Sequence, residues 1–315
     1  MSSPFFSVVI PLFNKEKHIK KTLTSVLDQT FQSFEIIVVD DGSQDKGVEV
    51  VESINDPRIR VISQANSGVS SARNLGIKQS EAEYIAFLDA DDLWLPDYLE
   101  SIYSLINEFP SAGIYSTGYI KRNSIGDVIN IKIRGLPRKK YRGILSNYFE
   151  IMVKGSPITW TSATCIPKNI FTENNIWFPS NEKYGEDQHV WARIMMRFEL
   201  AYDSKQCAIY EIETDNNSQA GIDKESKPHR SIVSLVKYRD EIKKKNEIKY
   251  FDLYIEKECV KTIKRNVVNG RRLDALRVLR ENNLSFFNNL LSILYLLTPY
   301  NFYKKLKRFI KKVTL

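Results

Sequence analysis

The sequence contains little cysteine and no long apolar run, and both absences exclude certain classes of protein. Three cysteines occur among 315 residues, far apart in the chain. Because they can build neither a disulfide framework nor a paired-cysteine zinc site, a reducing compartment is favoured. No uninterrupted apolar run reaches the roughly 18 residues of a membrane span, and the first residues lack the pattern of a secretory signal. We therefore expect a cytoplasmic protein without a membrane-spanning helix.

Several sequence motifs are also missing. The chain has no G-x-x-x-x-G-K-[ST] phosphate loop, no G-x-G-x-x-G after its first predicted strand and no G-x-S-x-G elbow. Kinases, NAD-dependent enzymes and serine hydrolases are therefore poor candidates. Glycine and proline are scarce, at 13 and 11 residues, and the chain is 43% apolar and 27% charged. This composition is typical of a globular protein with a large core.

Charge is distributed unevenly along the chain. The formal net charge is +8, but acidic side chains predominate in residues 1–100 and basic ones in residues 231–315. An acidic front can bind a metal ion, whereas a basic end favours the phosphates of a lipid surface or a nucleic acid.

The first third of the chain predicts an α/β fold. Four apolar runs rich in β-branched residues have the pattern of strands buried on both faces, and helical patterns separate them. The predicted strands are Phe6–Phe13, Phe34–Asp40, Arg58–Ile62 and Tyr84–Leu88, and the predicted helices are Lys15–Gln29, Gln44–Ile54, Val69–Gln79 and Pro96–Glu108. Such strands pair in parallel, and ligands bind beyond their carboxyl ends.

Beyond residue 110 the pattern is less regular. The predicted elements are a hairpin of Ala112–Lys121 with Asp127–Arg134, strands at Thr159–Ile166 and Gln206–Ile212, and a helix at Glu186–Phe198. We expect them to complete the same sheet and to close one side of the site. From Ser231 the pattern is helical and basic. We therefore predict a main domain of residues 1–230, with halves 1–110 and 111–230, and a C-terminal region 231–315.

Acidic residues gather where the fourth predicted strand ends. The segment Asp89-Ala90-Asp91-Asp92 follows it, and side chains two positions apart in an extended chain face the same side. Asp89 and Asp91 can therefore share one space. Their carboxylates repel each other unless a hard divalent cation such as Mg²⁺ or Mn²⁺ binds there. The alternative is that Asp91 or Asp92 caps the next helix.

Four other charged residues suit a ligand site. Asp41, in a turn after the second strand, can accept a hydrogen bond from a base or a ribose, although such a turn needs no function. Arg73 lies near a helix N-terminus, which favours phosphate oxygens; the alternative is a solvated arginine. Glu186 and Asp187 begin a helix, where either can act as a general base or simply complement the helix dipole.

Six segments follow one another in order between residues 7 and 193. They are Ser7-Val-Val-Ile-Pro-Leu-Phe-Asn-Lys-Glu16, Leu27-Asp-Gln-Thr-Phe31, Glu35-Ile-Ile-Val-Val-Asp-Asp-Gly-Ser43, Asn66-Ser-Gly-Val-Ser-Ser-Ala-Arg-Asn-Leu-Gly-Ile77, Phe87-Leu-Asp-Ala-Asp-Asp92 and Gly185-Glu-Asp-Gln-His-Val-Trp-Ala-Arg193. This set resembles the family 2 glycosyltransferases of the GT-A fold. The resemblance implies a Rossmann-like, nucleotide-binding mixed sheet flanked by helices. It also implies inverting transfer of a sugar from a nucleotide diphosphate sugar, with uridine as the expected base.

The resemblance also assigns roles to individual residues. It implies a nucleotide-sugar-binding half in residues 1–110 and an acceptor half in residues 111–230. The resemblance implies that Pro11, Phe13, Asn14 and Glu16 line the nucleoside site, that Asp41 contacts the base and that Asp89 contacts the ribose. It places Asn66 near the nucleotide and Arg73 near the donor. It further implies that Asp91 binds the metal, with Asp92 as a substitute, and that Asp187 is the catalytic base, with Glu186 as a substitute.

One segment departs from the pattern of the family. Many members carry a basic Tyr-Arg-x-His-like segment after the last strand, whereas Tyr210 is followed here by Glu211-Ile-Glu213. Other basic residues would have to replace its contribution to diphosphate binding. The candidates are Lys224, Lys227, His229 and Arg230.

The C-terminal region combines apolar and basic residues. Leucines and a phenylalanine recur at helical spacing within Leu284–Leu297, and basic residues follow Pro299. The basic residues are Lys304, Lys305, Lys307, Arg308, Lys311 and Lys312. Such a segment suits a helix that lies on an anionic bilayer, or one that packs on the protein. Membrane contact predicts a peripheral protein at the inner face of the cell membrane and a glycan or lipid-linked glycan acceptor, as in bacterial surface polysaccharide assembly.

Two alternative functions remain. A sugar nucleotidyltransferase also uses an α/β nucleotide site with acidic metal ligands, but it needs a glycine-rich phosphate segment that Pro11-Leu-Phe-Asn14 does not supply. A protein that binds nucleic acid or membrane through its basic end is the other alternative, because aromatic residues accompany the basic ones there. The acidic first third would repel a polyanion, so we expect no nucleic acid partner.

Overall fold

The first third of the chain forms parallel strands connected by helices, as predicted. The computed structural model describes residues 3–129, 131–180, 182, 184–212 and 227–297. The elements are β1 (Phe6–Leu12), α1 (Ile19–Leu27), β2 (Phe34–Asp40), α2 (Gly47–Glu52), β3 (Ile59–Ser63), α3 (Val69–Gln79) and β4 (Tyr84–Phe87). β1 pairs in parallel with β2 and β4, and β2 pairs in parallel with β3. The carboxyl ends of these strands therefore meet at one edge of the sheet.

The second part of the chain extends this sheet, which confirms the expectation of a single mixed sheet. Its elements are β5 (Leu93–Trp94), α4 (Tyr98–Glu108), β6 (Ile114–Arg122), β7 (Val128–Ile129), β8 (Arg142–Leu145), α5 (Tyr148–Lys154), η1 (Thr161–Ala163), β9 (Thr164–Pro167), α6 (Lys168–Asn174), α7 (Glu186–Met195) and β10 (Leu200–Glu211). The strand order is β3-β2-β1-β4-β9-β6-β10-β5, with β7 beside β6 and β8 beside β10. β9 is antiparallel to both of its neighbours.

One predicted strand begins later than its sequence pattern indicates. Residues 161–163 of the expected strand Thr159–Ile166 form the 3₁₀ turn η1, and β9 starts at Thr164. The reason is tertiary, because the side chains of Thr161 and Ser162 hydrogen-bond to carboxylates from elsewhere in the chain. A β-branched run alone does not reveal these partners.

The apolar core lies on both faces of the sheet. Because side chains alternate along a strand, Val8 packs on the face covered by α1 and α4, whereas Val9 packs on the face covered by α3 and α7. Helix α3 approaches β1 closely at Gly76, where an added Cβ atom would lie 2.4 Å from a methyl group of Val9. This packing holds the C-terminal half of α3 against the middle of β1.

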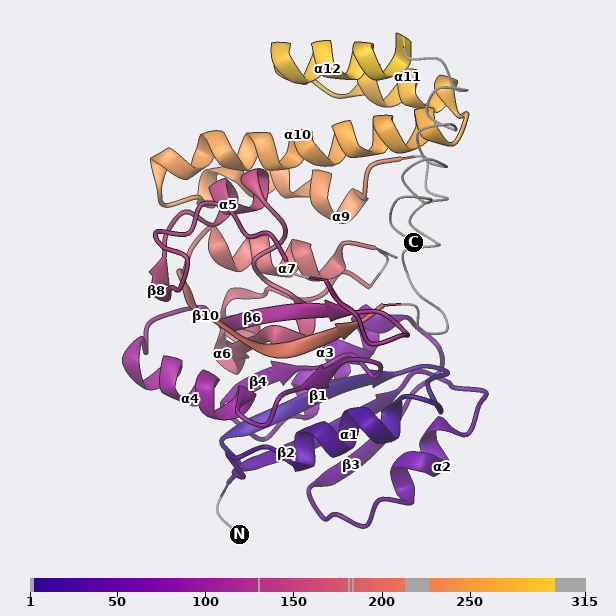
Figure 1. Ribbon diagram of the computed structural model, residues 1–315, viewed down its shortest axis with the longest axis vertical. Coiled ribbons are helices and arrows are strands. Elements are labelled where there is room, and N and C mark those ends of the chain that lie inside the picture. Colours follow the sequence, from indigo (N-terminus) through magenta and orange to yellow (C-terminus); the bar gives the residue numbers. More distant parts are fainter. Residues whose placement is uncertain (1–2, 130, 181, 183, 213–226, 298–315) are drawn as a thin grey trace.

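The C-terminal helices stack at one end of the molecule, beyond the sheet (Figure 1). They are α9 (Arg230–Val233), η2 (Ser234–Glu241), α10 (Lys245–Val268), α11 (Arg272–Glu281) and α12 (Phe286–Leu297). Phe251 of α10 packs against Phe149 of α5, with ring centroids 5.2 Å apart. The division near residue 230 stays a prediction, and apolar packing continues across it. Within the described ranges, no helix combines the length and apolarity that a membrane span requires.

Candidate active site

The turn after β4 presents two aspartates to one cavity. Asp89 accepts a hydrogen bond from Nη2 of Arg73 at 2.7 Å, and Asp91 forms an ion pair with Lys15. All four residues line the cavity. The side chains of Asp89 and Asp91 are 28% and 18% exposed, so both carboxylates are accessible to a ligand.

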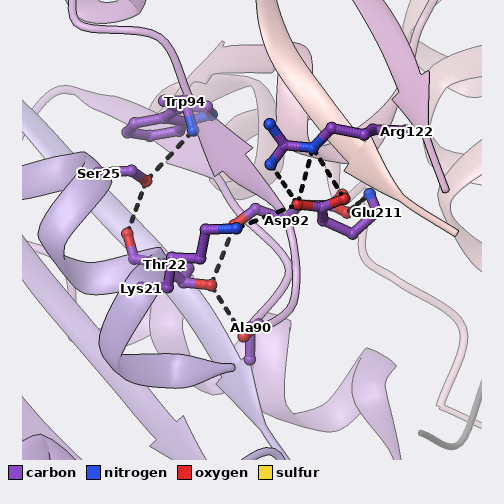
Figure 2. A network of polar contacts seen from close by, with 8 residues as sticks. All are labelled: Lys21, Thr22, Ser25, Ala90, Asp92, Trp94, Arg122 and Glu211. Carbon is purple, nitrogen blue, oxygen red and sulfur yellow. Dashed lines mark hydrogen bonds and ion pairs between the residues drawn. The ribbon is translucent and has the colours of Figure 1, made fainter. Parts of the chain in front are cut away.

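Asp92 has different surroundings from the other two aspartates. It is 1% exposed, and its carboxylate accepts hydrogen bonds from Ser162 Oγ (2.5 Å), Trp160 Nε1 (3.1 Å) and the backbone N–H of Glu211 (3.2 Å). Thr22 of α1 donates to its backbone carbonyl (Figure 2). Burial, and then the charges of the two neighbouring aspartates, raise the pKa of Asp92 well above its usual range. These contacts fix the turn, and a metal-binding role for Asp92 stays a prediction.

Asp41 and Asn66 both line the cavity, and their contacts with a base or a nucleotide stay predictions. One carboxylate oxygen of Asp41 accepts the backbone N–H of Ser67, and the other accepts that of Gly68, both at 2.8 Å. Asp41 therefore fixes the start of α3 while its buried carboxylate faces the cavity. The side chain of Asn66 is exposed.

The four residues predicted to line the nucleoside site at and after the end of β1 have two different surroundings. Two of them line the cavity, and the other two bond to the backbone of a neighbouring turn. Pro11 and Phe13 line the cavity, and Phe13 is 41% exposed. Asn14 and Glu16 instead accept hydrogen bonds from backbone N–H groups after β2, at 2.7 and 3.0 Å. Neither belongs to the described residues that line the cavity, so their nucleoside contacts stay predictions.

Arg73 connects the turn after β4 to the start of α7. The arginine is 3% exposed, and its guanidinium donates to Asp89 at 2.7 Å and to Oε1 of Glu186 at 2.9 Å. The sequence left open whether Arg73 is a solvated arginine, and the structure instead places it in a buried network of carboxylates.

Helix α7 brings two carboxylates to the cavity. It begins after Gly185, whose φ of 76° favours glycine. Burial and the neighbouring charge of Asp187 raise the pKa of Glu186 to about 7, although Arg73 acts in the opposite direction. Asp187 accepts a hydrogen bond from Thr161 Oγ1 at 3.0 Å. Within the described part of the chain Asp187 forms no ion pair, unlike Glu186.

The cavity has a volume of about 650 Å³ and a second wall that the sequence analysis did not identify. Lys121, Trp160 and Tyr210 line it from β6, the segment before η1 and β10, and helix α10 adds the side chains of Tyr254, Lys257, Glu258 and Lys261. No local motif marks these residues. Their distance in sequence from the acidic turns explains why only the tertiary structure finds them.

Comparisons with known proteins agree with this geometry. Residues 7–162 match the family described as Glycosyl transferase family 2. The chain belongs to this family. An uncharacterized glycosyltransferase of Rickettsia felis is 31% identical over 288 residues, covering 90% of this chain and 44% of the relative. The poly(ribitol-phosphate) beta-N-acetylglucosaminyltransferase TarS of Staphylococcus aureus is 32% identical over 195 residues, covering 58% of this chain and 31% of TarS. The chain thus spans less than half the length of these relatives.

Solved structures share the GT-A fold of this chain. S. aureus TarS 1–349 in complex with UDP-GlcNAc aligns with a TM-score of 0.63 at 20% identity, over 88% of this chain and 80% of that one. The mannosyltransferase PcManGT from Pyrobaculum calidifontis, in complex with GDP-Man and Mn²⁺, aligns with a TM-score of 0.60 at 16% identity, over 96% and 83%. The α/β mixed sheet with a C-terminal helical region agrees with the fold expected from the sequence.

Glu211, the last residue of β10, begins the acidic segment where the chain departs from the family pattern, and it has partners in the structure. Glu211 forms ion pairs with Arg122 of β6 and, at 3.4 Å, with Lys21 of α1 (Figure 2). Of the four proposed replacements, Lys224 lies outside the described residues and His229 lines the cavity, near Glu258. Lys227 and Arg230 line a separate hollow beside α11.

The residues of the turn after β4 fit a divalent cation that binds together with phosphate. Within the described ranges, no group of three or more His, Cys, Asp or Glu residues could hold a metal alone. Mg²⁺ and related ions, however, are commonly bound by one or two carboxylates plus substrate phosphates. The carboxylate of Asp91 faces a positive charge in this cavity, the ammonium group of Lys15.

Proposed function

We propose that this glycosyltransferase moves a sugar, with inversion, from a nucleotide diphosphate sugar to a hydroxyl group of a glycan or a lipid-linked glycan. The observation that carries the proposal is one cavity, at the carboxyl ends of parallel strands, that contains carboxylates with two different kinds of partner. Asp91 is paired with a cation, whereas Asp187 is held by the hydroxyl of Thr161.

Asp187 is the general base of the proposed reaction. It takes the proton of the acceptor hydroxyl as the acceptor oxygen bonds to the anomeric carbon. The bond between that carbon and the diphosphate oxygen breaks, and its electron pair leaves with the diphosphate. One base suffices for inversion. Glu186 is the weaker candidate because Arg73 already occupies one of its carboxylate oxygens.

The donor binds on the side of β1, β2 and α3. Pro11, Phe13, Asp41 and Asn66 face the nucleoside, and Arg73 holds Asp89 near the ribose. A uridine nucleotide is supported by the solved complexes of TarS with UDP and with UDP-GlcNAc. Mn²⁺ or Mg²⁺, when bound at Asp91, would stabilise the negative charge of the leaving diphosphate.

The acceptor approaches along the wall formed by α10 and is presented at a membrane surface. Leu290, Ile293, Leu294 and Leu297 of α12 are 46%, 44%, 53% and 72% exposed and follow helical spacing. This apolar stripe suits insertion into the interface of a bilayer. The basic residues after Pro299 would attract anionic lipids, and they lie outside the described residues.

A binding and turnover assay tests the proposed reaction. Wild type and Asp187→Ala are incubated with Mn²⁺ and a panel of nucleotide sugars, with donor binding followed by calorimetry and nucleotide diphosphate release followed with a membrane lipid extract. We expect both proteins to bind one donor and only the wild type to turn over. If the wild type binds no nucleotide sugar, the proposal is wrong.

Vesicle cosedimentation tests the membrane contact. We expect deletion of residues 299–315, or the double change Leu290→Ser and Leu294→Ser, to reduce binding to vesicles that contain anionic lipid. Ile125→Ser is the matched control, because Ile125 is 81% exposed in the turn between β6 and β7 and outside α12. Undiminished binding of both altered proteins would exclude the proposed surface.

A further inference from the structure

Lys121 occupies a position on the cavity wall that no motif identified. In the parallel pairing of β6 with β10, Lys121 lies opposite Tyr210. Its Nζ atom lies 5.0 Å from the ring centroid of Tyr210 and 5.5 Å from that of Trp160. The two rings are themselves 4.3 Å apart. The aromatic surfaces therefore hold the ammonium group at the cavity.

The ammonium group of Lys121 is half-buried and forms no ion pair with a carboxylate of the described residues, although the charge of Asp92 acts on it. The ion pairs of the described residues include none that involves Lys121, and burial lowers the pKa of this lysine. Lys15 and Arg73, by contrast, already have carboxylate partners in the same cavity. A desolvated cation on a cavity wall gains most from an anionic ligand.

The position of Lys121 also connects it to the turn after β4. Trp160, whose ring lies against the ammonium group, donates its Nε1–H to Asp92, the residue next to Asp91. Lys121 thus lies on the side of the cavity where Asp91 would hold the metal and the phosphates. The strand beside it continues into Glu211, which pairs with Arg122 rather than with a ligand.

We propose that Lys121 binds a phosphate oxygen of the donor diphosphate and stabilises the negative charge that develops when the bond to the sugar breaks. The inference rests on the proposed function. Lys121 keeps its proton throughout, because the acceptor proton goes to Asp187 and the electron pair of the broken bond stays on the diphosphate. It thereby supplies the positive charge that the acidic segment after Tyr210 does not.

Calorimetry with UDP and UMP in the presence of Mn²⁺ tests this assignment on the full chain. The loss of a charged hydrogen bond to the terminal phosphate should weaken UDP binding by Lys121→Met about tenfold, with UMP binding changed less than about twofold. Lys121→Arg should recover most of the affinity. Wild-type UDP binding should weaken at alkaline pH as the lysine loses its proton, and Lys121→Met should lack that dependence.

The control is Lys20→Met, which removes the same charge from an exposed position on α1 and should bind UDP like the wild type. Equal UDP affinity of Lys121→Met and the wild type would overturn the assignment. A higher KM for the acceptor with equal UDP affinity would also overturn it, because Lys121 would then contact the acceptor. Failure of the wild type itself to bind any nucleoside diphosphate would instead refute the proposed function.

Discussion

The turn after β4 and the first turn of α7 each contain two neighbouring carboxylates. They differ in whether the carboxylate with a proposed role in the reaction is paired with a cationic side chain. After β4, Lys15 pairs with Asp91, which faces the cavity, and Asp92 is buried among neutral donors. In α7, Arg73 pairs with Glu186, whereas the donors to Asp187 among the described residues are the hydroxyl of Thr161 and the backbone N–H of Gln188, both neutral. The first arrangement suits a residue that binds cations, and the second leaves a carboxylate able to accept a proton.

The largest expected effect separates the two carboxylates of α7. Asp187→Asn should lower kcat by about 10²–10⁴-fold, because the amide cannot accept the acceptor proton. Glu186→Gln should retain much more activity, since its amide oxygen can still accept a hydrogen bond from Arg73. Steady-state kinetics with a saturating donor measure both. If Glu186→Gln loses as much activity as Asp187→Asn, the two carboxylates do not differ in role.

The next effect concerns pH and stability. The pKa of Glu186 is raised to about 7 in the folded protein, so the folded state binds a proton that the unfolded state has already released. Stability associated with Glu186 is therefore present at pH below about 4.5 and is lost as the pH rises towards about 7, by on the order of 3 kcal/mol.

Urea unfolding of the wild type and Glu186→Gln between pH 5 and pH 8 measures this difference. We expect the wild type to lose stability relative to Glu186→Gln as the pH rises to about 7, and then to stay at a constant difference. Parallel curves for the two proteins would mean that Arg73 keeps Glu186 ionised over the whole range.

A smaller effect should distinguish Asp91 from Asp92. Asp91→Asn should weaken Mn²⁺-dependent donor binding about tenfold, because one ligand charge is lost. Asp92→Asn should leave metal binding nearly unchanged and lower the free energy of unfolding by about 1–3 kcal/mol, since its amide group cannot accept all the hydrogen bonds of Asp92. Mn²⁺ titration and thermal melting separate the two. Loss of metal binding in Asp92→Asn would assign that residue to the metal.

The smallest effect tests how Asp187 is positioned. Thr161→Val removes the hydroxyl that donates to Asp187 and should lower kcat roughly five- to tenfold, with donor affinity unchanged. Thr161→Ser keeps the hydroxyl and should restore most of the turnover. Equal losses in Thr161→Val and Thr161→Ser would contradict the assignment of this effect to the hydrogen bond.

The sequence by itself determined the regular first half of the molecule. Continuous β-branched runs separated by amphipathic helices specify parallel strands, because each element buries a face whose period is visible locally. The same local order places Asp41, Asp89 and Asp91 at strand ends. The segments that carry the family resemblance lie in this half and at the start of α7.

Only the tertiary structure decided which of these residues share a surface, and with what partners. Asp92 and Asp91 are adjacent in sequence, yet the hydroxyl of Ser162 and the ammonium group of Lys15 assign them to different environments. Lys121 and the side chains of α10 reach the cavity through strand order and helix stacking. Contacts between residues far apart in the chain depend on the packing of whole elements, which no local pattern of side chains records.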